Sequence, residues 1–115
     1  MTDDCLFCKI VAGEIPSEGV LDRETVYAFR DIAPAAPVHV LVVPKEHVRD
    51  AMVIDGSHGA ILVEMIDAGN EIARNAGISE SGYRLIFNVG PDAGQTVFHL
   101  HMHVVGGKPL GPVAS

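Results

Sequence analysis

The sequence predicts an α+β fold with one long helix, a short N-terminal helix and a mostly antiparallel sheet of about five strands. Only residues 57–76 have the length and apolar spacing of a long helix, and strand-like runs precede and follow this segment. Strands that are segregated from the helices along a chain are typical of the α+β class. A small parallel α/β fold is the alternative, but a parallel sheet needs crossover helices, and a single long helix disfavours it.

The first half of the chain predicts the short helix and three strands. Residues 5–12 are expected to form a short helix or turn that a glycine closes. Strand-forming residues follow at positions 20–22 and, with alternating character, at 25–30. Residues 39–43 are a mostly β-branched run ended by a proline, which indicates a buried strand.

The second half predicts the long helix and two further strands. Apolar side chains recur at helical spacing over residues 57–76, with Ser57 as the expected N-cap and Gly77 as the expected C-cap. The remaining elements are expected to be a strand over residues 83–89, a glycine-containing loop over 90–94 and a last strand over 96–105.

The composition fits one globular domain. The chain has 115 residues, 48% of them hydrophobic, and we expect a single domain over residues 1–115. Eight Lys and Arg against 15 Asp and Glu give a net charge of −7, which disfavours binding to nucleic acid polymers. No apolar stretch reaches the roughly 18 residues of a membrane-spanning helix. The acidic N-terminus does not resemble a signal peptide, so we expect a cytoplasmic protein without a membrane partner.

Three histidines alternate with apolar residues in the last predicted strand. His99, His101 and His103 stand at i, i+2 and i+4. Because side chains alternate between the two faces of a strand, the three imidazoles would share one face. A neutral imidazole can attack phosphorus or a carbonyl carbon and can then be displaced by water. A three-histidine metal site is the alternative that this spacing leaves open.

The loop before these histidines suits a phosphate group. Residues 90–96 form a glycine-containing turn, and backbone N–H groups in such a turn can surround an anion. Gln95 and Thr96 add side-chain donors. An anion site beside a nucleophilic histidine indicates phosphoryl chemistry.

Residues 94–105 resemble the signature of the histidine triad (HIT) superfamily, in which three histidines alternate with apolar residues. Similar sequence at residues 7–16, 31–34 and 37–47 extends the resemblance over nearly the whole chain. The ending Val105-Gly106-Gly107 resembles the Hint branch, the histidine triad nucleotide-binding proteins. The resemblance implies a HIT-like fold and a homodimer in which the long helix and a strand pair to form one continuous sheet.

The resemblance also implies a purine nucleoside phosphoramidase, which hydrolyses the P–N bond of a nucleoside 5′-phosphoramidate to a nucleoside monophosphate and an amine. His101 would attack the α-phosphorus and form a nucleotidyl-histidine intermediate, which water then resolves. His103 would contact the phosphate, and His39 would hydrogen-bond the other nitrogen of His101 directly or through the backbone. Thr96 completes the implied catalytic set, and the reaction would need no metal.

The implied partner is a purine nucleotide, bound in a pocket with three parts. Asp31 would bind the ribose, because a carboxylate can accept hydrogen bonds from two neighbouring hydroxyls. Asn88 would contact the sugar and phosphate. The residues implied to hold the phosphate are Gly94, Gln95, Thr96, His101 and His103. The residues implied to surround the base are Phe7, Ile10, Phe29, Ile32 and Leu41.

Cys5 and Cys8 form a Cys-x-x-Cys pair, which in a cytoplasmic chain indicates metal or redox chemistry more than a structural disulfide. A subset of HIT proteins uses such a pair as half of a zinc site. The resemblance implies that His47 and His99 supply the other half. Two cysteines and two histidines form a closed, structural zinc set. Two reduced thiols and a redox pair are the alternatives.

Other functions stay open at the level of sequence. A dinucleoside polyphosphate hydrolase or nucleotidyl transferase of the same superfamily would use His101 with a phosphate leaving group. A non-catalytic regulator would bind nucleotide without needing the nucleophile. A histidine-based metal-binding protein would place its ion at His101.

Overall fold

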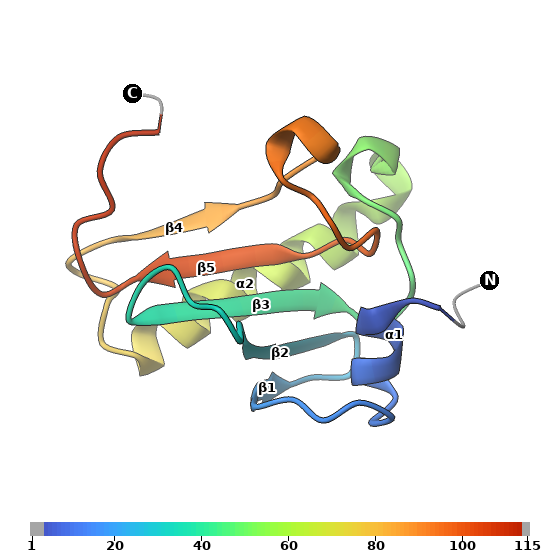
Figure 1. Cartoon of the computed structure of the whole chain (residues 1–115), viewed down its shortest axis with the longest axis horizontal. Coiled ribbons are helices and arrows are strands. Elements are labelled where there is room, and N and C mark those ends of the chain that lie inside the picture. Colours follow the sequence, from blue (N-terminus) through green and yellow to red (C-terminus); the bar gives the residue numbers. More distant parts are fainter. Residues whose placement is uncertain (1–3, 114–115) are drawn as a thin grey trace.

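Five strands form one antiparallel sheet, and the long helix lies against one of its faces (Figure 1). The computed structural model describes residues 4–113. Across the sheet the strand order is β1-β2-β3-β5-β4, and each neighbouring pair is antiparallel. The predicted α+β class is therefore confirmed. The elements are α1 (Leu6–Val11), β1 (Gly19–Asp22), β2 (Val26–Arg30), β3 (Val38–Pro44), α2 (Gly59–Asn75), β4 (Tyr83–Ile86) and β5 (Met102–Gly106).

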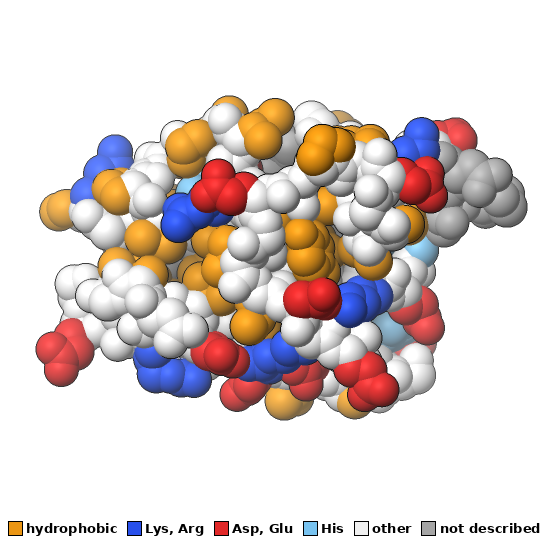
Figure 2. Space-filling model, turned by 90° about the horizontal axis from the view of Figure 1, so that it is seen from below, with side chains coloured by type: hydrophobic (Ala, Val, Ile, Leu, Met, Phe, Trp, Pro, Cys, Tyr) orange, Lys and Arg blue, Asp and Glu red, His pale blue; other side chains and the backbone are white. Residues whose placement is uncertain are grey.

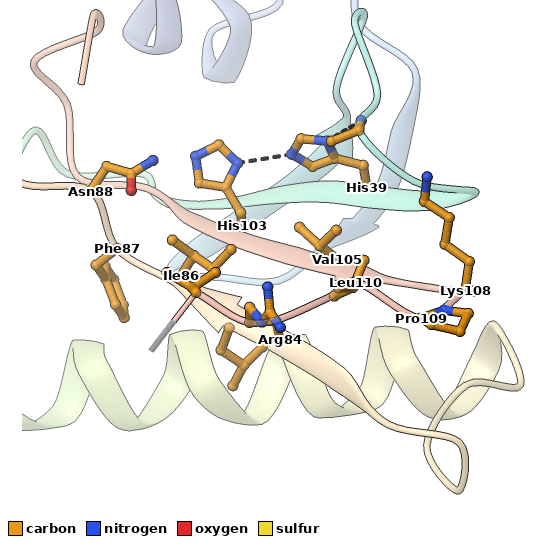
Figure 3. Close-up of a pocket in the computed structure, with 13 residues that line it drawn as sticks. His39, Arg84, Ile86, Phe87, Asn88, His103, Val105, Lys108, Pro109 and Leu110 are labelled. Atoms are coloured by element: carbon orange, nitrogen blue, oxygen red, sulfur yellow. Dashed lines mark hydrogen bonds between the residues drawn. The ribbon is translucent and has the colours of Figure 1, made fainter. Parts of the chain in front are cut away.

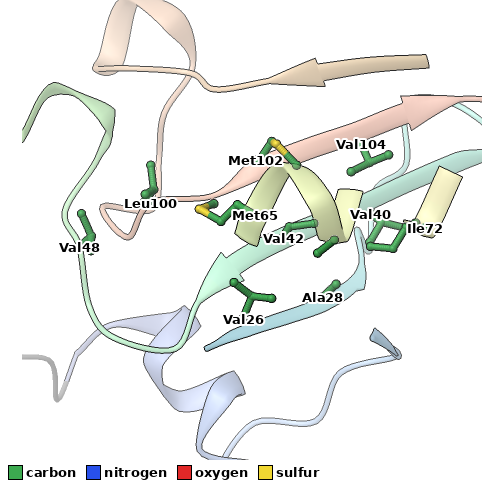
Figure 4. Close-up of a cluster of buried hydrophobic side chains, with 11 residues drawn as sticks. Val26, Ala28, Val40, Val42, Val48, Met65, Ile72, Leu100, Met102 and Val104 are labelled. Carbon is green, nitrogen blue, oxygen red and sulfur yellow. The ribbon is translucent and has the colours of Figure 1, made fainter. Parts of the chain in front are cut away.

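Alternation along the strands directs one set of apolar side chains toward α2. In β3, Val40 and Val42 pack with Met65 and Ile72 of the helix (Figure 4). Successive side chains in a strand point to opposite faces, so the residues between them face away from α2. The apolar residues predicted to alternate with the histidines are buried in this same layer, and they are Leu100, Met102 and Val104.

A second, smaller apolar cluster covers part of the opposite face. Phe7 of α1 packs with Phe29, Leu41 and Val43 from the sheet. The ring centroids of Phe7 and Phe29 are 5.5 Å apart, with the rings nearly perpendicular. Three of the residues predicted to surround a base are therefore also core residues. This cluster places α1 near the end of β3, as Figure 1 shows.

Helix α2 begins later than the sequence predicts. Ser57 is not its N-cap, because Ser57 lies in a preceding 3₁₀ turn (Gly56–His58) and His58 occupies the cap position. Asp55 caps that turn by accepting hydrogen bonds from the backbone and hydroxyl of Ser57. The helix ends at Asn75, and Gly77 then adopts a left-handed conformation with φ of 75°, which suits the predicted terminator.

Strand β5 begins later than the predicted strand over residues 96–105, at Met102. The segment before it is held by bonds outside the sheet ladder. The Leu100 N–H donates to the Val48 carbonyl at 2.6 Å, and Val48 lies in an irregular segment after β3. His103 is consequently the one member of the histidine run that lies within a described strand.

Strand β4 ends at Ile86, earlier than the predicted end at residue 89. The predicted loop over residues 90–94 contains a short 3₁₀ turn (Pro91–Ala93). Gly90 and Gly94 flank this turn with φ of 84° and 87°, a region that L side chains rarely adopt. These two glycines reverse the chain so that it runs toward the histidines.

Charged side chains of both signs are interspersed on the surface seen in Figure 2. Arg23, which follows β1, binds Glu64, Asp67 and Glu71 of α2 and so fastens the β1–β2 turn to the helix. This face does not offer the broad basic surface that nucleic acid polymers need. Within residues 4–113, no helix combines the length and apolar character required to cross a membrane.

Candidate functional site

Three histidines gather on the face of the sheet that α2 leaves uncovered. His103 of β5 lies opposite Leu41 of β3, and His39 stands two residues before Leu41. The ring centroids of His39 and His103 are 5.1 Å apart, and those of His101 and His103 are 5.2 Å apart. Figure 3 shows His39 and His103 beside each other, on the far side of the sheet from α2.

A backbone carbonyl fixes the orientation of His101. Its Nδ1 lies 2.7 Å from the carbonyl oxygen of His99. A carbonyl only accepts hydrogen bonds, so Nδ1 carries the proton and Nε2 keeps its lone pair. The ring edge of His101 also packs against Phe7, with centroids 5.0 Å apart. His101 is therefore held with an unprotonated nitrogen available for attack.

His39 gives His103 the opposite proton arrangement. The Ala35 N–H donates to Nδ1 of His39, so neutral His39 carries its proton on Nε2. That N–H points at Nδ1 of His103, 2.8 Å away. His103 accepts there and carries its own proton on Nε2. The expected bond from His39 to His101 is wrong, since the His99 carbonyl takes the second nitrogen of His101 and His39 bonds His103 instead.

Burial keeps both histidines neutral. It lowers the pKa of His101 below the usual value of 6.5. It lowers the pKa of His103 to about 4, with a further contribution from the neighbouring rings of His101 and His39. At pH 7 one ring therefore offers a lone pair and the other an N–H donor.

A cavity of about 340 Å³ opens in front of these two rings. It brings together every residue predicted to bind the nucleotide except Gln95. Leu6, Arg30 and Val97 also line the cavity and were not predicted. Each is the immediate neighbour of a predicted residue in the sequence. The predicted residues that line the cavity are Phe7, Ile10, Phe29, Asp31, Ile32, Leu41, Asn88, Gly94, Thr96, His101 and His103.

The Gln95 side chain does not point into the cavity as predicted. Its side chain is only 4% exposed and points into its own loop. Its Oε1 accepts from the Gly90 N–H at 2.8 Å, and its Nε2 donates to the Val97 carbonyl at 3.2 Å. The amide therefore bonds the loop backbone, and the prediction that it donates to a phosphate is wrong. Gly94 and Thr96 on either side remain exposed at the cavity.

A larger hollow of about 710 Å³ lies on the same face and shares Asn88 and His103 with the cavity. Strands β4 and β5 form its floor, and the C-terminal segment passes beside it (Figure 3). Arg84 and Lys108 supply its positive charges. The two hollows meet at His103, so a molecule bound in the smaller one can extend past this ring into the larger one.

A separate cluster of four side chains lies at the other end of the histidine run. Cys5, Cys8, His47 and His99 each present a donor atom, and these atoms lie within 4.8 Å of one another. His99 Nδ1 lies 3.3 Å from Cys5 Sγ, 3.4 Å from Cys8 Sγ and 3.2 Å from His47 Nδ1. Cys8 Sγ and His47 Nδ1 are 3.4 Å apart. The structure thus unites the four predicted metal ligands.

These separations fit a tetrahedral zinc ion. Zn–S bonds of about 2.3 Å and Zn–N bonds of about 2.05 Å place tetrahedral ligands about 3.3–3.8 Å apart. His99 is fully buried, and its Nε2 lies 2.8 Å from the Pro44 carbonyl. This bond puts the proton on Nε2 and leaves Nδ1 as the metal-binding nitrogen, an arrangement typical of zinc-bound histidines.

Known proteins resemble this chain over nearly its whole length. The sequence pattern of the HIT domain matches residues 12–110. The purine nucleoside phosphoramidase of Escherichia coli (strain K12) is 43% identical over 113 residues, which cover 98% of this chain and 95% of that protein. The structure of a HIT family hydrolase from Clostridium thermocellum matches with a TM-score of 0.93 and 50% identity, over 97% of both chains. A histidine triad protein from Clostridium difficile matches with a TM-score of 0.92 and 43% identity, over 96% of both chains.

Proposed function

This chain belongs to the HIT domain family, and from that premise we propose that it is a purine nucleoside phosphoramidase. It would hydrolyse the P–N bond of a nucleoside 5′-phosphoramidate. Asp31 would bind the ribose, and the apolar wall that includes Phe7 and Ile32 would contact the base. The relative from Escherichia coli bears the name of this activity. The 340 Å³ cavity supports the proposal, because its lining combines a carboxylate, an apolar wall and two histidines.

The observation that carries the proposal is the opposite proton placement on His101 and His103. Nε2 of His101 would attack the α-phosphorus while the His103 Nε2–H donates to a phosphate oxygen. The P–N bond breaks, and the amine leaves with a proton from water into the larger hollow. Positive charge develops on the His101 ring in the nucleotidyl intermediate, and the His99 carbonyl on Nδ1 stabilises it. Water then attacks phosphorus and releases the nucleoside monophosphate.

Replacing the nucleophile tests the proposal. We expect the wild type to convert adenosine 5′-monophosphoramidate to adenosine monophosphate, and His101→Ala to lower kcat by at least about a thousandfold. His101→Ala should still bind adenosine monophosphate, because the cavity wall remains. His58→Ala, in the turn before α2, is the matched control and should keep wild-type turnover.

Two results would contradict the proposal. Full turnover by His101→Ala would exclude this ring as the nucleophile. A folded wild type that binds nucleotide without turning over the phosphoramidate would point to a different leaving group, and dinucleoside polyphosphates would then be the next substrates to assay.

We further propose that the Cys5, Cys8, His47 and His99 cluster binds one structural zinc ion. Its donor set and its 3.2–3.4 Å separations support this assignment. His101 lies outside the cluster, so the ion would not take part in the chemical step. Protein purified without chelator should contain about one equivalent of zinc, and less than about 0.1 equivalent would overturn the assignment.

We also propose that the protein is a cytoplasmic homodimer. Strand β4 is at an edge of the sheet, so its outer backbone groups can pair with a second copy. Asn70 of α2 bonds Tyr83 of β4, and one and two turns earlier along the same stripe Ile66 and Val63 are exposed. This apolar stripe beside an open edge supports an interface built from α2 and β4.

A further inference from the structure

Helix α1 forms one wall of the nucleotide cavity and packs on the sheet through Phe7, with Ile10 and Val11 partly buried beside it. It has six residues, and a helix of this length is not stable by itself in water. Phe7 is its one buried residue, while Leu6 is exposed. Leu6, Phe7 and Ile10 all line the cavity. The shape of the cavity therefore depends on whatever fixes α1 against the sheet.

The cysteine–histidine cluster is placed to fix it. Cys5 is the N-cap of α1 and accepts a hydrogen bond from the Cys8 N–H at 3.4 Å, so both thiols belong to the first turn of the helix. Their partners come from elsewhere in the chain. His47 follows β3, and His99 precedes β5. The cluster thus joins α1 to two segments at the same end of the sheet.

Cys5 lines a hollow other than the nucleotide cavity, and a small solute can reach it there. A separate hollow of about 490 Å³ is lined by Cys5, His47 and Arg49, among others. Leu6, Thr96 and Val97 line both this hollow and the nucleotide cavity, so the two lie next to each other. Cys5 and Cys8 are both partly exposed.

We propose that Cys5 and Cys8 form an oxidation site whose substrate class is a small hydroperoxide, and that oxidation releases α1 from the nucleotide cavity. The proposal rests on the zinc assignment and on nucleotide binding in the cavity. One thiolate sulfur attacks a peroxide oxygen, the O–O bond breaks, and a sulfenic acid and water form. The second thiolate displaces hydroxide from that sulfur to make the disulfide. In sum, two thiolates, hydrogen peroxide and two protons give one disulfide and two waters.

Oxidation would remove two of the four donors at once. His47 and His99 alone do not make a closed zinc set, so the cluster would lose its ion together with the link between α1 and the sheet. Phe7 would then no longer pack firmly on His101, to which it lies 5.0 Å away between ring centroids. Nucleotide binding should weaken before the sheet itself is affected, because α2 and its apolar layer lie on the other face.

The test adds hydrogen peroxide to the zinc-loaded full chain. Three quantities are followed: zinc release with a chromogenic chelator, free thiols by titration, and the Kd for adenosine monophosphate by calorimetry. We expect the two thiols and one zinc ion to be lost together, and the Kd to rise by at least about tenfold, as loss of one buried aromatic contact would produce. Dithiothreitol with added zinc should restore all three, and circular dichroism should show the sheet unchanged throughout.

The variant Cys5→Ser/Cys8→Ser is the matched control, because it keeps the methionines that peroxide also oxidises. It should bind nucleotide weakly from the start and should not respond to peroxide. If this variant does not fold, the reversible response of the wild type still decides the proposal.

Two outcomes would overturn the proposal. In the first, both thiols are oxidised and zinc is released while the Kd stays unchanged, so α1 does not depend on the cluster. In the second, both thiols survive millimolar peroxide. Absence of phosphoramidase turnover, with the Kd still rising on oxidation, would instead contradict the proposed activity and leave this inference standing.

Discussion

Two neighbouring histidines in this protein carry their protons on different nitrogens. The His99 carbonyl fixes one tautomer on His101, and the Ala35 N–H fixes the other on His103 by way of His39. Both arrangements need neutral rings, and burial supplies that neutrality by lowering the two pKa values. At this scale, the backbone decides which ring can attack and which can donate.

The low pKa of His103 predicts how stability changes with acidity. In the unfolded chain this group has an ordinary pKa near 6.5, and in the folded protein its pKa is about 4. As pH falls, the unfolded chain takes up the proton first, so the free energy of unfolding should decrease between about pH 6.5 and pH 4. Urea unfolding at a series of pH values measures this, and His103→Gln should make the decrease smaller.

A ¹⁵N titration provides the direct check on the same residue. His103 should stay neutral down to about pH 5 in the folded protein. A midpoint near 6.5 would show that burial does not desolvate this ring.

At the residue scale, the sequence predicted which side chains belong to the candidate site, but not which hydrogen-bond partners they have. The alternation of histidines with apolar residues is visible in the sequence, and so is the apolar character of the positions implied to surround a base. The partner of His39 depends on the register between β3 and β5, which brings His103 alongside it. Gln95 could not be distinguished from a phosphate ligand, because its orientation depends on the Gly90 turn into which it folds.

At the scale of elements, close packing at the end of β5 limits which residues the strand accepts. A Cβ atom added to Gly106 would lie 2.8 Å from Ile78 Cδ1, 3.2 Å from Tyr83 Cβ and 3.3 Å from the Gly82 carbonyl. Two of these neighbours belong to β4 or to the turn before it, and a backbone carbonyl cannot move aside cheaply. The glycine therefore lets β4 and β5 approach as closely as they do.

Gly106→Ala should lower the free energy of unfolding by about 1–3 kcal/mol, the usual cost of overpacking. Gly59→Ala is the matched control, since a Cβ there meets nothing within 4 Å and the residue lies in α2. It should change stability by less than about 0.5 kcal/mol. Urea denaturation of both variants measures the difference, and equal midpoints for Gly106→Ala and the wild type would contradict this account of the packing.

Element types were predictable from the sequence, whereas element ends were not. A period of two along the last strand predicted burial of Leu100 and Met102 correctly, because an extended chain alternates whether or not it belongs to a sheet. Where the ladder begins depends on which backbone is opposite, and Leu100 faces Val48 in an irregular segment. Helix α2 begins later than predicted for a similar reason, because Asp55 caps a 3₁₀ turn that precedes the helix.

At the scale of the whole molecule, the two edges of the sheet differ. Strand β4 borders the exposed apolar stripe of α2, whereas the turn after β1, at the opposite edge, is fastened to the helix by the ion pairs of Arg23. The apolar stripe beside β4 is why we place the proposed interface at this edge of the sheet.

Sedimentation equilibrium should show a dimer for the wild type. Ile66→Glu places a charge in the proposed interface and should raise the dimer Kd by at least about tenfold. Val20→Glu makes the same change at an exposed position on β1 and should leave the dimer intact. Equal effects of the two variants would place the interface elsewhere.

An exposed apolar side chain at the rim of the nucleotide cavity determines how the enthalpy of nucleotide binding should change with temperature. Ile32 is 101% exposed, so its whole side chain is hydrated before a ligand arrives. A purine ring lying on it would remove that apolar surface from water, which gives association a negative heat capacity change. Binding would then become more exothermic as the temperature rises, while the affinity itself changes little because the entropy compensates.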